Sequence, residues 1–88
     1  MYTIVFTRTA AKDVSKLKAA HLDEKARELI DIIRKNPFQV PPPYEKLTGN
    51  LRGMYSRRLN QQHRLIYELF EQEKTIKIVS LWSHYERG

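Results

Sequence analysis

The sequence predicts an α+β fold in which two N-terminal helices pack on one face of a twisted antiparallel β-sheet. Helical apolar spacing is confined to the first 36 residues, alternating β-favouring segments fill the chain from residue 54 onward, and one short strand-like segment precedes the helices. The expected element order is β-α-α-β-β-β-β in a single domain, residues 1–88. The uncovered face of the sheet is where functional side chains are expected.

The helical half begins with a strand, because residues 2–6 alternate and end in β-favouring types. Thr7 or Thr9 can then cap a short amphipathic helix. Its apolar face consists of Ala10, Val14 and Leu17. A second helix is predicted from a longer stripe with charged residues outside it. That stripe contains Leu22, Ala26, Leu29, Ile30 and Ile33.

The second helix should end near Asn36, since Pro37 has no amide hydrogen and disfavours helical geometry in the residue before it. A proline-rich, semi-rigid and extended connection is expected over residues 38–44. It leads into a short segment that begins at Glu45 and a turn at Gly49.

The second half predicts an antiparallel meander. Three alternating segments, residues 54–59, 63–70 and 75–82, read as strands. The intervening segments, 60–62 and 71–74, are short and polar, as hairpin turns are.

Composition limits the classes of function. The chain has 88 residues, 41% of them hydrophobic and 30% charged, which is typical of a folded soluble domain with a thin core. It has no cysteine, so disulfides and thiolate metal sites are excluded. The segment Met1–Phe6 is too short and too weakly basic for a signal peptide, so a cytoplasmic location without membrane attachment is expected. A net charge of +6 favours a polyanion or an acidic protein as partner.

Three arginines form the densest functional signal. If the turn at 60–62 is short, Arg64 lies opposite Arg57 or Arg58, and like charges opposed across strands are unfavourable. This arrangement suggests a bound anion. The plainer alternative is that the arginines point to opposite faces and are solvated.

Glu45, the arginines and His84 together form the minimum set for cleaving an RNA phosphodiester by its ribose 2′-hydroxyl: a base, a cation and an acid. His63, within an alternating strand, is more readily structural, and His21 a cap or surface residue. The histidines lack metal-ligand spacing, so chemistry without a metal or other cofactor is expected.

Several motifs together resemble the YoeB/Txe branch of the RelE toxin superfamily over nearly the whole chain. They are Asn36-Pro37-Phe38, Glu45-Lys46-Leu47, Asn50-Leu51-Arg52-Gly53, Tyr55-Ser56-Arg57-Arg58, His63-Arg64-Leu65-Ile66-Tyr67 and Ser83-His84-Tyr85. Two departures are Tyr55, where relatives often carry tryptophan, and the tail at 86–88, which extends beyond the usual His-Tyr ending. Neither removes a catalytic group.

The resemblance implies a RelE-like, microbial RNase-like fold and a ribosome-dependent messenger RNA endonuclease. By resemblance, Glu45 is the general base, Arg64 the phosphate-stabilising arginine and His84 the general acid. Tyr85 would help to hold the substrate. Lys46, Arg57 and Arg58 would support binding of RNA or the ribosome.

The implied partners are a Phd/YefM-type antitoxin, the 70S ribosome with its messenger RNA, and operator DNA bound only by the toxin–antitoxin complex. Whether the free toxin is a homodimer is left open. Two other functions remain as alternatives. One is a ParE-like toxin that acts on DNA gyrase without cleaving RNA, and the other is a non-enzymatic basic module that binds nucleic acid.

Overall fold

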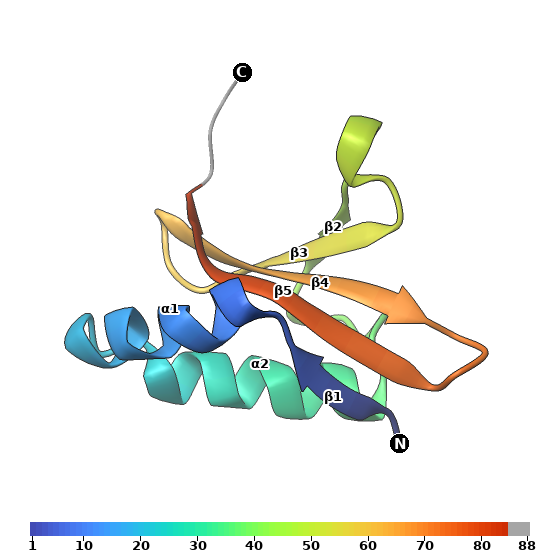
Figure 1. Cartoon of the computed structure of the whole chain (residues 1–88), viewed down its shortest axis with the longest axis horizontal. Coiled ribbons are helices and arrows are strands. Elements are labelled where there is room, and N and C mark those ends of the chain that lie inside the picture. Colours follow the sequence, from blue (N-terminus) through green and yellow to red (C-terminus); the bar gives the residue numbers. More distant parts are fainter. Residues whose placement is uncertain (85–88) are drawn as a thin grey trace.

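The computed structural model describes residues 1–84, and of His84 only the backbone. The predicted order of elements is confirmed (Figure 1). The helices and strands are β1 (Thr3–Phe6), α1 (Arg8–Ala19), α2 (Asp23–Lys35), β2 (Tyr44–Lys46), the 3₁₀ turn η1 (Gly49–Leu51), β3 (Met54–Arg58), β4 (His63–Phe70) and β5 (Thr75–His84). No helix among these residues is long and apolar enough to cross a membrane.

The five strands form one sheet in the order β1-β5-β4-β3-β2. The meander β2-β3-β4-β5 is antiparallel, as predicted, but β1 pairs with β5 in parallel, so the sheet is mixed rather than antiparallel. A parallel pair needs a long crossover, and here both helices and three strands separate its members. Alternation within a strand does not report its direction relative to such a distant partner, so the sequence could not show this.

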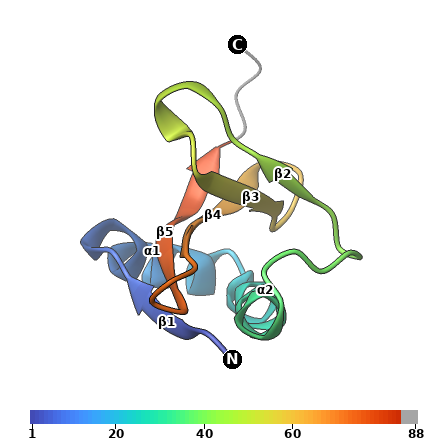
Figure 2. The same cartoon turned by 90° about the vertical axis from the view of Figure 1, so that its right-hand side faces the viewer.

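Both helices lie on one face of the sheet, as predicted (Figures 1 and 2). The cap of α1 is Thr7, whose Oγ1 accepts from the Ala10 amide at 3.0 Å. The core between the layers combines helix and strand residues that are almost fully buried. These are Ala10, Leu17, Ala26, Leu29, Ile33, Leu59, Leu65, Tyr67, Ile76, Ile78 and Leu81.

The last strand is longer than expected, because it ends at His84 rather than at residue 82. Its pairing with β4 is irregular on both sides of Ile66, where β5 carries extra residues. The start of α1 satisfies backbone groups in this irregular stretch. Thr7 Oγ1 donates to the Val79 carbonyl at 2.7 Å, and a carboxylate oxygen of Asp13 accepts from the Leu81 amide at 3.0 Å. Thr7 and Asp13 therefore hold the irregular middle of β5 in place.

Candidate active site

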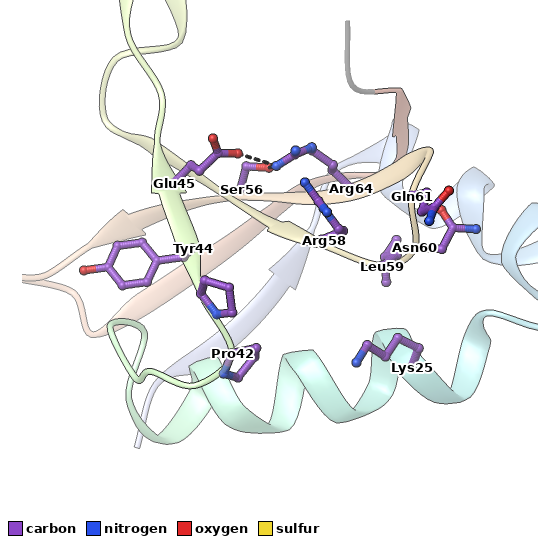
Figure 3. A pocket seen from close by; sticks show the side chains of 11 residues that line it. Lys25, Pro42, Tyr44, Glu45, Ser56, Arg58, Leu59, Asn60, Gln61 and Arg64 are labelled. Carbon is purple, nitrogen blue, oxygen red and sulfur yellow. Dashed lines mark hydrogen bonds and ion pairs between the residues drawn. The ribbon is translucent and has the colours of Figure 1, made fainter. Parts of the chain in front are cut away.

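The predicted base and the predicted cation meet on the sheet face that the helices leave open. Glu45 of β2 lies opposite Ser56 of β3, and Arg58 of β3 lies opposite Arg64 of β4. Since alternate residues of a strand share a face, these four side chains project from the same side of the sheet. Figure 3 shows Glu45, Ser56 and Arg64 converging there.

Arg64 binds Glu45 directly. Its Nη1 donates to Glu45 Oε1 in a close ion pair and to Ser56 Oγ at 3.3 Å. The Arg64 side chain is only 9% exposed, whereas that of Glu45 is 56% exposed. The buried guanidinium therefore orients a carboxylate that a substrate can still reach, and a proton acceptor stands beside a fixed positive charge.

Arg58 and Arg64 are directly opposed across the hairpin, which confirms one of the two pairings expected from the sequence. Glu45 offsets the charge of Arg64. The ion pairs among the described residues do not include Arg58, whose side chain is exposed. The site thus keeps an uncompensated cation, as a site for an anion should.

These side chains border a pocket of about 530 Å³ (Figure 3). The pocket extends from the Glu45–Arg64 pair past the turn after β3 to helix α2. Its lining residues are Lys25, Pro42, Pro43, Tyr44, Glu45, Ser56, Arg58, Leu59, Asn60, Gln61 and Arg64. Ser56 and Lys25 were not among the site residues predicted from the sequence. Ser56 could have been found, because it is two residues from Arg58 in the same strand and so shares its face.

Arg57 does not join this pocket. Arg57 faces the helix layer and is 1% exposed. The substrate-binding role expected from the sequence does not fit this buried position. Its guanidinium donates to the Tyr67 hydroxyl (3.2 Å), the Pro42 carbonyl (2.7 Å) and the Pro37 carbonyl (3.0 Å). Carbonyl and hydroxyl oxygens solvate this buried cation.

Tyr67 completes the arrangement, since its hydroxyl donates to the Pro37 carbonyl at 2.8 Å. Burial raises the pKa of Tyr67, and the neighbouring Arg57 acts in the opposite direction. The hydrogen bonds of Arg57 and Tyr67 to the Pro37 and Pro42 carbonyls hold both ends of the proline-rich segment, and we call this arrangement the clamp. The segment bends over 37–42 instead of running extended as predicted. Figure 2 shows this segment returning from α2 to β2.

The clamp helps to position Glu45, because Arg57 contacts Tyr44, the neighbour of Glu45 in β2. Tyr44 lies opposite Arg57 in the β2–β3 pair, and its ring centroid is 5.2 Å from Arg57 Cζ. Tyr44 also contacts the rings of Phe38 and Tyr55, each with centroids 5.9 Å away. The strand that carries Glu45 has three residues, so these contacts on its other face help to hold it on β3.

The remaining predicted residues are less closely associated. Lys46 is exposed, lies opposite Tyr55 and, by alternation, is on the other face from Glu45. His84 ends β5 and pairs with His63, one position from the Arg64–Ser83 pair, so its backbone lies beside the site. Its side chain and the whole of Tyr85 lie outside the described residues, and their proposed roles stay predictions.

The other two histidines have the positions that the sequence suggested. His63 is buried and stacks on Trp82 with centroids 3.7 Å apart, and His21 is exposed in the turn between the helices. Within the described residues no three His, Cys, Asp or Glu side chains gather as metal ligands. The expectation of chemistry without a metal remains a prediction.

Comparison with known proteins agrees with this architecture. Residues 6–85 match the family described as YoeB-like toxin of bacterial type II toxin-antitoxin system. The chain is similar to Toxin YoeB of Synechocystis sp., at 39% identity over 59 residues, covering 67% of this chain and 66% of that protein. It is also similar to Toxin YoeB of Escherichia coli K12, at 36% over 62 residues, 70% and 71% of the two chains.

Two solved structures resemble the fold closely. One is the YoeB/ParE toxin from Agrobacterium tumefaciens, with a TM-score of 0.85 and 26% identity over 94% of this chain and 99% of that one. The other is YoeB in a heterotetrameric YoeB-YefM complex from Staphylococcus aureus, with a TM-score of 0.80 and 34% identity over 97% and 99%. Because the family match spans nearly the whole chain, including the strands that carry Glu45 and Arg64, the protein belongs to the YoeB-like toxins of bacterial type II toxin-antitoxin systems.

Proposed function

We propose that this toxin is an endoribonuclease that cleaves messenger RNA in the ribosomal A site and thereby inhibits translation. The observation that carries the proposal is the pairing of an accessible Glu45 with a buried Arg64 on a pocket that also contains Arg58. This places a proton acceptor and two cations where a phosphodiester can enter. Neither a gyrase-binding toxin nor a simple basic module requires a carboxylate held in this way.

The proposed reaction needs no metal. The Glu45 carboxylate accepts the proton of the ribose 2′-hydroxyl, and the freed oxygen attacks the adjacent phosphorus. Arg64 and Arg58 stabilise the negative charge that gathers on the phosphate oxygens. The bond to the 5′-oxygen breaks as that oxygen takes a proton, for which His84 is the proposed donor. The products are a 2′,3′-cyclic phosphate and a 5′-hydroxyl, and Tyr85 is proposed to help hold the substrate.

We further propose that the toxin acts as a single cytoplasmic domain and is inactivated by a Phd/YefM-type antitoxin. The relative from Staphylococcus aureus, solved as a YoeB-YefM complex, supports this partner. A net charge of +6 suits an acidic antitoxin segment that folds on contact. The toxin–antitoxin complex, rather than the toxin alone, is proposed to bind operator DNA and repress its own operon.

The test is to add purified toxin to ribosomes that are translating a defined message and to map the new RNA ends. The proposal expects ends within the A-site codon, a 2′,3′-cyclic phosphate, and persistence of cleavage when divalent ions are chelated after ribosome integrity has been controlled. Glu45→Gln is the matched inactive control. If no new RNA ends form on intact ribosomes, the proposed nuclease activity is refuted. Inhibition of DNA gyrase instead would establish the ParE-like alternative.

A further inference from the structure

The pocket is larger than the cleavage chemistry requires. The Glu45–Arg64 pair occupies one side, yet the space continues to Lys25 of α2 on the other, with Arg58 between them in the view of Figure 3. Its volume of about 530 Å³ falls within the range of about 300–1,000 Å³ typical of small-molecule sites. This is room for more of a substrate than the reacting phosphate.

The charges of this extension favour a second phosphate. Three cations and one carboxylate line the pocket, and the carboxylate is already paired with Arg64. Lys25 is exposed, and the ion pairs among the described residues do not include it. Lys25 and Arg58 therefore present positive charge from two different elements, α2 and β3, toward the same space.

The uncharged lining suits a nucleobase. Pro42 and Pro43 border the pocket on one side, and Leu59, 5% exposed, contributes a further apolar surface. Asn60 and Gln61 add side-chain amides at the turn after β3. Apolar contact with the face of a base and amide contact with its edge is how proteins bind unpaired RNA bases.

We propose that the part of the pocket between Arg58 and Lys25 binds the nucleotide next to the scissile phosphate of a single-stranded RNA. Lys25 contacts the phosphate of that nucleotide, and its base lies against Pro42 and Pro43 near Gln61. The inference rests on the RNA-cleaving function proposed above. It assigns a substrate contact to helix α2, whereas the sequence predicted functional side chains on the uncovered face of the sheet.

The test measures binding without cleavage, using the full-length toxin and RNA in which the attacking 2′-hydroxyl is methylated. Affinity is compared for a dinucleotide and for trinucleotides extended at the 5′ or the 3′ end, at several salt concentrations. One extension should tighten binding to the wild-type protein. Lys25→Ala should lose that gain, so its affinity for the extended RNA should be about three- to tenfold lower than that of the wild type at low salt. The slope of log affinity against log salt concentration should become shallower by roughly 0.7, the value for one phosphate contact on a single strand.

Three controls make the result specific. Lys25→Arg should retain the gain, because it keeps the charge. Lys35→Ala removes an exposed lysine of the same helix that does not line the pocket, and it should bind as the wild type does. A trinucleotide that is abasic at the added position should lose the part of the gain that comes from the base.

The proposal is overturned if neither extension tightens wild-type binding, or if Lys25→Ala keeps the full gain and salt slope. These readouts are separate from catalysis. If the wild-type toxin does not cleave on ribosomes but shows a Lys25-dependent gain, the proposed activity is refuted and the pocket is a binding site for single-stranded RNA only. Normal cleavage with a gain independent of Lys25 would overturn the subsite alone.

Discussion

Tyr67→Phe tests the clamp under β2 with the loss of a single oxygen atom. Tyr67 is fully buried, and its hydroxyl donates to the Pro37 carbonyl and accepts from Arg57 Nε. The Pro37 carbonyl keeps its bond from Arg57 Nη2, so one acceptor stays satisfied and Arg57 Nε alone loses its partner. We expect a loss of about 1–2 kcal/mol in the free energy of unfolding. For a domain of this size each kcal/mol lowers Tm by roughly 4–8 °C.

The matched control is Tyr55→Phe, because Tyr55 stacks on Tyr67 but its hydroxyl makes no hydrogen bond among the described residues. It should change the free energy of unfolding by no more than about 0.5 kcal/mol. Denaturant titrations of the free toxin and calorimetric melts measure both. A Tyr67→Phe protein with wild-type Tm would show that these bonds add nothing to stability, and would refute the clamp.

Tyr67 also makes the stability of the fold depend on pH, and the direction of its pKa shift fixes the sign of that dependence. Burial raises the pKa of Tyr67 in the folded state, so folding favours the neutral phenol. Its contribution to stability is complete below the unfolded pKa of about 10 and is lost as pH rises through the higher folded value. Above about pH 10 the wild type should therefore lose more stability than Tyr67→Phe. Parallel loss in the two proteins would contradict the reasoning.

Three further predictions concern the site and its support. In single-turnover cleavage on saturating ribosomes, Glu45→Gln should slow the reaction by roughly 10²–10⁴-fold, as loss of a general base does; a rate near that of the wild type would rule out this carboxylate. Arg64→Ala should also weaken RNA binding and its salt dependence, and unchanged salt dependence would argue against a phosphate contact. Asp13→Ala should leave the buried Leu81 amide without its acceptor and cost about 1–3 kcal/mol, measured by denaturant titration beside Lys16→Ala, which is expected to be nearly neutral.

Periodicity predicted most of the fold because each element carries its own pattern. The stripe from Leu22 to Ile33 and the break at Pro37 located α2, and alternation located β3 and β4. What it could not show depends on contacts between distant segments. The parallel pairing of β1 is one case, and the binding of the irregular stretch of β5 by Thr7 and Asp13 is another.

The sequence likewise predicted some of the residues that the structure brings together, but not the direction in which every side chain points. Glu45 and Arg64 stand in strands whose register brings them together, as the motif resemblance implied. Arg57 shows the limit, because adjacent arginines in a strand point to opposite faces and the sequence does not say which face is covered. Only the packed structure shows that Arg57 binds the proline-rich segment and that Arg58 lines the pocket.

The parallel pair β1–β5 has a consequence for the order of folding during synthesis. Among these strands β1 is made before all the others and its partner β5 after them, and the hydrogen bond of Thr7 must await Val79, 72 residues later. Contacts of such long range are slow to form and close only after most of the chain exists. The helices and the β2–β4 hairpins can assemble earlier, whereas the strand that ends at His84 joins them at the end. A nascent chain therefore cannot complete this sheet until β5 has been made and has left the ribosome.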